Sequence, residues 1–548
     1  MKRLLVLLAF FFFQFINAET TLTEPQKLTT TCKVWGFLKY YHPKVANGDF
    51  NWNTQLLENL PKIEQAKNKK EFSLVLENWI NSLGDLQKTA PILPKEKLEY
   101  FDKNFDLSWL DDSKMFTKSL SEKLKFIEKN RFQGEHFYVG KHMAGNIFIK
   151  NEDFTNFNSM DKNDRILALF TYWNLIEYFF PYKYVMDVKW DATLEQMIPR
   201  FCNAQTEDEF YLTMQALTAK INDSHVVFYR YTRRHFLPMV AKIIDNKMIV
   251  TEILNPDLTE SNGVKVGDII TKINDKSIEQ IIAEKRDLIS ASNDSRFLHD
   301  IIEPILSGKE DTIKLEFLTD GKYLSKTINW ADYNQNRYVL KSIPKYKASK
   351  VKFKQIENNI GYVNMAFLHI KDIPEMIEKL QSTKAIVFDL RNYPNGTYEA
   401  ISAFINSKEK LFAVYTAPDL SYPGRFFWQE GTTSGTQNNN NYKGKVIVLI
   451  DEASLSQSEW TAMCFQTADN TTLIGSQTAG ADGNVTDIDY MKAFHSSFTG
   501  LGVYYPDRRE TQRIGIIPDI AIKPTIKGML EGKDEVLERA LQFIETGK

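Results

Sequence analysis

Short apolar stretches alternate with segments of helical periodicity between residues 346 and 530. The stretches "KAIVFDLR" (384–391), "KVIVLI" (445–450) and "TTLIGS" (471–476) are rich in apolar residues, and helical patterns separate them. Strands that are apolar on both faces are typical of sheets that helices cover on both sides. We therefore predict a largely parallel α/β core over residues 346–530.

The stretch "IDEASLSQSEWTAMCF" (450–465) follows one of these strands and crowds three serines into five positions. Where a buried strand runs straight into a helix, the turn projects a side chain outward, and the first unpaired N–H groups of the helix point at the same place. A nucleophilic serine needs such donors for an oxyanion, together with a base and a group that orients the base. Ser456 is the candidate nucleophile.

Ser456 also begins an S-x-x-E pattern with Glu459, which is the sequence of a capping box. In a capping box the serine only satisfies a backbone donor. Because the local spacing by itself favours the cap, the wider pattern of the chain has to decide between a nucleophile and a cap.

Residues 34–61 and 172–199 are two copies of one sequence, aligned without a gap, with Trp35 matching Trp173. Each copy has aromatic residues at helical spacing, a turn at a proline and a second amphipathic segment. We predict two copies of a helical unit whose aromatic residues form core. A carbohydrate-facing or assembly surface is the alternative.

The pattern changes to short strands between residues 235 and 332. The strands "MIVTEIL", "GVKVGDIITKINDKSI" and "DTIKLEFL", with a helical "IEQIIAEKRDLI" and a turn at Gly267 and Asp268, follow the order of a PDZ domain. A small α+β insert of another fold would have a similar sequence pattern. PDZ domains bind an extended peptide by adding it as a strand beside a helix.

Three motifs in the C-terminal half carry a family resemblance. The motifs "DLRNYPNG" (389–396), "SLSQSE" (454–459) and "GIIPD" (515–519) follow the PDZ-like segment in that order. Together they resemble the serine peptidases of the C-terminal-processing-peptidase and tricorn family, over roughly residues 220–522. The resemblance implies a ClpP/crotonase-like α/β core with a PDZ domain, and it implies that Ser456 is the nucleophile.

The chain departs from this family at the position of the base. Members that pair the serine with a downstream lysine have that lysine where this chain has Ala481, and tricorn-like members have a histidine where this chain has Asn364. A chlamydial secreted member instead has a histidine in a "DxH" segment ahead of the PDZ domain and a glutamate near the closing motif. The matching residues here are His225 and Glu510.

We therefore predict a triad of Ser456, His225 and Glu510. A neutral imidazole accepts the serine proton near pH 7, and a carboxylate at its other nitrogen fixes the tautomer. For His225 the alternative is a buried or surface histidine without a catalytic role. For Glu510 it is a surface ion pair with a neighbouring arginine, and Asp507 is a rival for its role.

The oxyanion is expected to bind the N–H of Gln457 and one from Asn395 or Gly396, where a glycine permits close backbone approach. Arg391, with Asp389, is expected to support this turn. Asp482 and Asn484 are near the cleft without an assigned role.

Composition excludes several other classes of function. Lys and Arg total 68 against 70 Asp and Glu, so there is no field that would attract nucleic acid. The cysteines Cys32, Cys202 and Cys464 and the eight histidines have no metal-ligand spacing. A single Cys32–Cys202 bridge and free thiols both remain open. We expect no metal, no other cofactor and no nucleic-acid partner.

The first residues, "MKRLLVLLAFFFFQFINAET", have a basic start, an apolar stretch and a small residue at Ala18. This is typical of a secretory signal. An uncleaved anchor is the alternative, but Gln14 and Asn17 interrupt the apolar run before the ~20 residues that a membrane span needs. We expect export to a periplasm or the cell exterior and no later transmembrane segment.

These observations predict an exported serine endopeptidase that cleaves peptide or unfolded protein through an acyl-enzyme. The alternative is a catalytically inactive protein on the same fold that binds peptide or lipid. The oligomeric state is not predicted. The expected organisation is a multidomain α/β chain with a signal peptide (1–18), helical copy one (19–88), an irregular connecting region (89–160), helical copy two ending in the DSH segment (161–234), a PDZ-like domain (235–332), the peptidase core (346–530) and a C-terminal helix (531–548).

Overall fold

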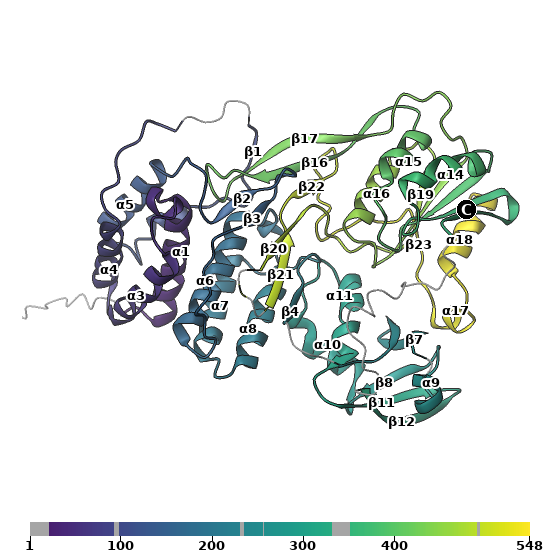
Figure 1. The fold of residues 1–548 in the computed structure, drawn as a ribbon, viewed down its shortest axis with the longest axis horizontal. Coiled ribbons are helices and arrows are strands. Elements are labelled where there is room, and N and C mark those ends of the chain that lie inside the picture. Colours follow the sequence, from purple (N-terminus) through teal and green to yellow (C-terminus); the bar gives the residue numbers. More distant parts are fainter. Residues whose placement is uncertain are drawn as a thin grey trace, which may run out of the picture. The chain divides into compact units, whose positions relative to one another are not determined.

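The computed structural model describes residues 21–92, 98–230, 235–255, 257–330, 351–489, 491 and 494–548. The expected signal peptide lies outside the described residues. The chain divides into two compact units, one of residues 1–92 and 106–132 and the other of residues 93–105 and 133–548. Helices build the first unit, and the second combines helices with several sheets, so the prediction of a multidomain α/β protein is confirmed (Figure 1).

The first unit is helical. Its first helix begins at a capping box in which Thr23 and Gln26 bond each other's backbone N–H groups. This arrangement satisfies two of the donors that a helix N-terminus leaves unpaired. The unit comprises α1 (Glu24–Tyr41), α2 (Pro43–Ala46), α3 (Trp52–Gln65), α4 (Lys69–Ser82) and α5 (Lys118–Lys129).

Each copy of the internal repeat contains a reciprocal pair of tryptophans. In the first copy the Trp35 indole N–H donates to the carbonyl of Trp52 at 3.2 Å, and the Trp52 indole donates to the carbonyl of Trp35 at 3.0 Å. In the second copy, Trp173 and Trp190 exchange the same two bonds at 3.0 Å each. Because a buried indole N–H needs an acceptor, the pair fixes the angle between two helices in both copies.

The second copy lies in the second unit and comprises α6 (Lys162–Phe179), α7 (Trp190–Asn203) and α8 (Glu207–Ala219). The region between the copies, expected to be irregular, contains the helix α5, which Thr117 caps by accepting the Leu120 N–H at 3.3 Å. The same region contains a hairpin of β2 (Val139–Lys141) and β3 (Ile147–Ile149).

The segment predicted to be PDZ-like forms its own sheet over its own apolar core. Its strands β6 (Met239–Ile244), β7 (Lys247–Ile253), β8 (Ile269–Ile273), β11 (Thr312–Thr319) and β12 (Lys322–Asn329) are ordered β12-β11-β8-β7-β6. The helices with this sheet are α9 (Asp257–Asn262), α10 (Ile278–Lys285), α11 (Asp294–Asp300) and α12 (Ile302–Ile305).

The predicted α/β core is a six-stranded sheet ordered β13-β14-β15-β18-β19-β23, parallel except at β13. The continuous apolar runs form its central strands, as predicted. The elements are β13 (Phe353–Ile356), β14 (Ile360–Asn364), α14 (Ile373–Leu380), β15 (Ala385–Asp389), α15 (Tyr398–Ile405), β18 (Lys445–Ile450), α16 (Gln457–Phe465), β19 (Thr471–Gly475), β23 (Ile520–Ala521), α17 (Ile526–Leu530) and α18 (Glu535–Thr546).

Alternate residues of the core strands pack against different helices. Ile386 and Phe388 of β15 join a core with α14, α15 and α16, whereas Ala385 and Val387 join a second core with α18. This follows from the two-residue period of a strand. Figure 1 shows α14 to α16 and α18 around this sheet. Two-sided coverage is the reason that the strands are apolar throughout.

A second sheet, ordered β1-β17-β16-β22, joins β1 (Tyr100–Phe101), β16 (Lys410–Pro418), β17 (Phe426–Ser434) and β22 (Gly502–Tyr504). The segment 431–445 is polar in sequence, but its first residues belong to β17. A third sheet joins β20 (Val485–Ile488), β21 (Phe494–Thr499) and β4 (Phe228–Arg230). It attaches the DSH segment to the C-terminal half of the chain.

Candidate active site

Ser456 lies between β18 and α16, at the N-cap of the helix. Its backbone has φ 57° and ψ −111°, a conformation that non-glycine residues rarely adopt. The Glu459 carboxylate accepts the Ser456 N–H at 3.2 Å, which is one half of the expected capping box. The Ser456 hydroxyl occupies the other half of the box, facing the Glu459 N–H, although without a hydrogen bond of full geometry. Ser456 therefore both caps α16 and lines the adjacent cavity.

The two neighbouring serines have structural roles that Ser456 does not share. The Ser454 hydroxyl donates to the carbonyl of Leu390 at 2.7 Å, and the Ser458 hydroxyl donates to that of Asn392 at 2.7 Å. Both bonds attach the turn before α16 to the turn after β15. Of the three serines, only the middle one lines a cavity.

A buried carboxylate holds the segment 478–481 against this turn. Glu459 accepts the N–H groups of Gly480 at 2.8 Å and Ala481 at 3.0 Å, and it also accepts the Thr478 hydroxyl. Burial raises the pKa of Glu459, while these four donors, counting Ser456, act in the opposite direction. The Ser456 N–H is shared with the carbonyl of Ala481 at 3.1 Å.

His225 is buried, and its hydrogen bonds determine its tautomer. The Thr499 hydroxyl donates to Asp223 Oδ1 at 2.9 Å, so its proton is committed to that carboxylate. His225 Nδ1 lies 2.8 Å from the same hydroxyl oxygen and must therefore be the donor. In the neutral ring this leaves the lone pair on Nε2, which is buried and has no hydrogen-bond partner among the described residues. Such an imidazole is prepared to accept a proton.

The carboxylate that supports this histidine is Asp223. Its Oδ1 also accepts the His225 N–H at 3.1 Å and the Gln512 side-chain amide at 3.0 Å, and its Oδ2 accepts the Thr499 N–H at 2.7 Å. Burial lowers the pKa of His225, and the charge of Arg296 adds to this, whereas the Asp223 charge raises it.

Glu510 was predicted as the carboxylate that orients His225, but in this structure it bonds other groups. Its Oε1 accepts bonds from Lys103 Nζ at 2.8 Å and the Tyr184 hydroxyl at 3.2 Å. The rival, Asp507, pairs with Arg509 Nε at 2.6 Å. Sequence reasoning missed Asp223 as the orienting acid although it is the first residue of the "DSH" motif. No local signal marks Thr499.

Ser456 lines a cavity of about 670 Å³ together with Gln457, Asp482 and Asn484. His225 does not line it, and the Ser456–His225 hydrogen bond is not formed. Ser456 is linked to one end of the segment 481–485, and His225 is linked to the other end through Thr499. The Ser456 N–H bonds Ala481, and His225 bonds Thr499, which pairs with Val485 in the β20–β21 ladder.

The predicted oxyanion donors lie in different surroundings. Gln457 is the first residue of α16, where an N–H has no partner within the helix, and it lines the Ser456 cavity. Asn395 and Gly396 are exposed and are not among the residues that line this cavity. Gly396 has φ 63° with open space around it, and Asn395 Nδ2 donates to the carbonyl of Ala366 at 2.7 Å.

Arg391 lies between two carboxylates. Its guanidinium donates to Asp389 at 2.9 and 2.7 Å, and to Asp534 at 2.7 and 2.8 Å. The Tyr362 hydroxyl donates to Asp389 Oδ2 at 2.8 Å. Arg391 therefore joins the end of β15 to Asp534, the N-cap of α18.

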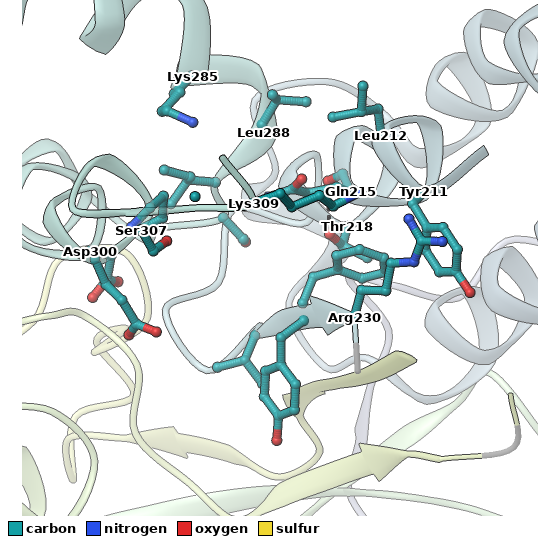
Figure 2. A pocket seen from close by; sticks show the side chains of 18 of the residues that line it. Tyr211, Leu212, Gln215, Thr218, Arg230, Lys285, Leu288, Asp300, Ser307 and Lys309 are labelled. Atoms are coloured by element: carbon teal, nitrogen blue, oxygen red, sulfur yellow. Dashed lines mark hydrogen bonds between the residues drawn. The ribbon is translucent and has the colours of Figure 1, made fainter. Parts of the chain in front are cut away.

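A second cavity, of about 1050 Å³, lies beside the DSH segment. Ser224 and Val226, which flank His225, are among its lining residues. It lies between α8, β4 and the PDZ-like segment. Figure 2 shows Tyr211 and Arg230 on one side of it and Asp300 with Ser307 on the other.

Other sites expected to be absent are not seen in the described part of the chain. The described residues hold no group of three or more His, Cys, Asp or Glu side chains arranged to bind a metal ion. No helix within them has the length and apolar character needed to cross a bilayer. No disulfide joins Cys32, Cys202 or Cys464 in the structure.

Comparison with known proteins matches the α/β core to one family. A family model described as Peptidase family S41 matches residues 359–522. A carboxy-terminal-processing protease of Bartonella bacilliformis is 29% identical over 212 residues, which cover 36% of this chain and 46% of that protein. The chain thus spans about half the length of this curated relative.

Solved structures show the same fold over a longer part of the chain. Mature CPAF in complex with lactacystin has a TM-score of 0.57 and 11% identity, and the match covers 70% of this chain and 99% of that one. Mature CPAF has a TM-score of 0.56 at 11% identity, covering 70% of this chain and 98% of that one.

Proposed function

We propose that this chain is a serine endopeptidase of peptidase family S41, the family whose model matches residues 359–522, with Ser456 as nucleophile and His225 as general base. The observation that carries the proposal is the state of the two groups. Ser456 has a strained backbone and lines a cavity with a hydroxyl that makes no cap hydrogen bond of full geometry, and His225 has the tautomer with an unpartnered Nε2.

The chemistry follows from these groups. Ser456 Oγ attacks the peptide carbonyl carbon as its proton passes to His225 Nε2. The tetrahedral intermediate then collapses, the C–N bond breaks, and the leaving amine takes that proton from Nε2. Water attacks the resulting ester with His225 again as base, which releases the carboxylate product and restores the serine.

The two groups have to approach each other for this reaction. Catalytic hydrogen bonds are often long in an empty site and shorten when substrate binds. The segment 481–485 bonds Ser456 at one end and pairs at the other with Thr499, the partner of His225, so it is the element whose adjustment would close the gap. Asp223, through Thr499, holds the imidazole in the required tautomer.

The developing oxyanion would bind the Gln457 N–H, which has no helical partner and lines the cavity. A second donor would come from the turn at Asn395 and Gly396. This part of the proposal requires the turn to move toward Ser456, because neither residue lines the cavity of the empty site.

The larger cavity is our candidate for docking an extended substrate beside the PDZ-like segment. It is lined by residues of β4, by β5 (His235–Phe236) and by β10 (Ser307–Gly308). Within the described sheets, β4 pairs only with β21, and β5 and β10 pair only with each other, so each has an open edge. Open strand edges beside a cavity bind peptide by strand addition.

We also propose that the chain is exported, because residues 1–18 have the pattern of a secretory signal. The destination is a periplasm or the cell exterior. Mass spectrometry of protein purified from outside the cytoplasm tests this. A mature N-terminus near Glu19 is expected, and an intact Met1 on exported protein would contradict cleavage.

A catalytically inactive binding protein on the same fold is the second candidate, because the Ser456–His225 hydrogen bond is not formed. Hydrolysis of unfolded casein separates the two. A peptidase degrades casein, and Ser456→Ala reduces the rate at least 10³-fold while the protein keeps its unfolding midpoint. A wild type that binds casein without cleaving it, or a Ser456→Ala variant with unchanged rate, favours the second candidate.

A further inference from the structure

The cavity that contains Ser456 has acidic side chains and no basic ones. Glu399, Glu430 and Asp482 line it, and its lining includes no Lys, Arg or His. None of these three carboxylates forms an ion pair with another described residue. Glu399 accepts a hydrogen bond from the Tyr398 hydroxyl at 3.2 Å.

Carboxylates elsewhere in the α/β core have cationic partners. Asp389 pairs with Arg391, and Asp372 pairs with Lys352 at 2.7 Å. Glu399 and Glu430 are exposed and have no cationic partner among the described residues. Their negative charges favour a cation in this cavity, and a basic side chain of the substrate would supply it.

Aromatic rings line the same cavity and suit a cation as well. Tyr415 stacks on Trp460 with ring centroids 5.8 Å apart, and Tyr398 meets Trp460 edge-on at 6.1 Å. Tyr393, which is 61% exposed, also lines the cavity. The faces of such rings attract ammonium and guanidinium groups. Trp460 is one turn of α16 beyond Ser456, so these rings lie next to the nucleophile.

Asp482 gives a second and independent indication. It is only 3% exposed, its Oδ1 accepts the Gly483 N–H at 2.7 Å, and its Oδ2 is buried without a hydrogen-bond partner in the structure. Burial and the nearby Glu459 charge raise the pKa of Asp482 well above its usual value. A buried oxygen without a partner is costly unless a ligand donates to it.

We propose that the Ser456 cavity selects peptides with a lysine or arginine side chain beside the bond that is cleaved. Glu399 and Glu430 attract the cation, the rings of Tyr415 and Trp460 pack on its aliphatic stem and charged head, and Asp482 Oδ2 accepts a hydrogen bond from it. The inference rests on the proposed peptidase function, whose nucleophile shares this cavity.

Four fluorogenic peptides test the inference. They are identical except for one residue, which is Arg, Lys, Leu or Glu on the N-terminal side of the scissile bond, and the cleaved bond is identified by mass spectrometry. We expect kcat/KM for Arg and Lys to exceed that for Leu at least 10-fold and that for Glu at least 100-fold. In the double variant with Glu399→Gln and Glu430→Gln, the ratio of kcat/KM for the Arg peptide to kcat/KM for the Leu peptide should fall at least 5-fold.

Glu409→Gln is the matched control, because Glu409 is an exposed acid on the neighbouring segment and does not line the cavity. Its Arg-to-Leu ratio should equal that of the wild type. Equal cleavage of the four peptides, or a preference for Leu or Glu, overturns the inference while the peptidase proposal stands. If no peptide is cleaved and a fluorophosphonate fails to label the folded protein, the peptidase proposal fails as well.

Discussion

At the scale of single residues, the backbone positions the candidate nucleophile. The Ser456 N–H is shared between Glu459 and Ala481, and the Ser456 carbonyl accepts the Trp460 N–H at 2.9 Å. These bonds maintain a positive φ of 57°, which is unfavourable for a side chain with a Cβ. Such strain is typical of a residue that the surrounding structure holds for function.

The pH dependence of activity should report the burial of His225. Burial disfavours the imidazolium and lowers the pKa of His225 below 6.5. A general base works only when neutral, so activity is lost only as pH falls through this lowered pKa. We predict that the acid limb of the kcat/KM profile has its midpoint below pH 6.5.

The variant Asp223→Asn is the companion measurement. It removes the charge that raises the pKa of His225, so any residual activity should show an acid limb at still lower pH. A wild-type limb centred above pH 6.5, or a limb that moves upward in Asp223→Asn, would contradict the assignment of His225 as the base.

Thr499 is a positioning residue because it connects His225 to Asp223. Thr499→Val keeps the volume but removes the hydroxyl that accepts from Nδ1, so the ring is free to adopt the other tautomer. We predict a fall in kcat on the order of 10²-fold, with a changed pH profile. Thr499→Ser should restore most of the rate. Equal rates for the valine and serine variants would show that the hydroxyl has no part.

At this scale the sequence predicted part of the site. Ser456, His225 and Arg391 stand in motifs whose order in the chain can be read directly. Glu510 was predicted as the orienting acid from its place near the closing motif, whereas in the structure Asp223 is the carboxylate linked to His225 through Thr499. Only the fold reveals that Glu510 faces Lys103, and that Thr499 reaches His225 across 274 residues.

At the scale of elements, the junction of β18, α16 and the segment 478–481 depends on Glu459. We predict that Glu459→Gln lowers the free energy of unfolding by about 3 kcal/mol, because an amide has one acceptor oxygen and turns its NH₂ toward N–H donors. Urea unfolding followed by circular dichroism measures this. Glu375→Gln, on the exposed face of α14, is the control and should change stability little. Equal stability of both variants would contradict the role of Glu459.

Elements with a strong apolar pattern were predictable. The core strands follow from apolar runs that helices cover on both sides. The helices α14 to α16 follow from the helical patterns between these runs. The helix α5 was missed because it lies in a charged stretch where only a few apolar residues face the core. The strand β17 was missed because its sequence "FFWQEGTTS" ends in polar residues that are partly exposed.

At the scale of the second unit, Arg391 connects the α/β core to its C-terminal helix. Its two bidentate pairs satisfy Asp389 and Asp534 together. Lysine cannot reproduce this planar fork. We predict that Arg391→Lys lowers the free energy of unfolding by about 2 kcal/mol. Arg508→Lys changes an exposed ion pair with Glu99 and should lower the free energy of unfolding only slightly. Equal losses in the two variants would contradict the role of Arg391.

The assembly of the site from distant parts was beyond sequence reasoning. The candidate residues come from the DSH segment, the β18–α16 turn and the β20–β21 hairpin. The three-stranded sheet β20-β21-β4 joins the first of these to the third. Motif order indicates a family, but it does not give the register of that sheet. The register places Thr499, and not Glu510, next to the imidazole.

The most direct test of the account maps the adduct that a fluorophosphonate forms on the folded, full-length protein. We predict one adduct, located by mass spectrometry on Ser456, with a rate constant that falls at least 100-fold in His225→Gln and is unchanged in His299→Gln. An adduct on another residue, a rate that is indifferent to His225→Gln, or no adduct on the folded wild type would contradict the claim that His225 activates Ser456.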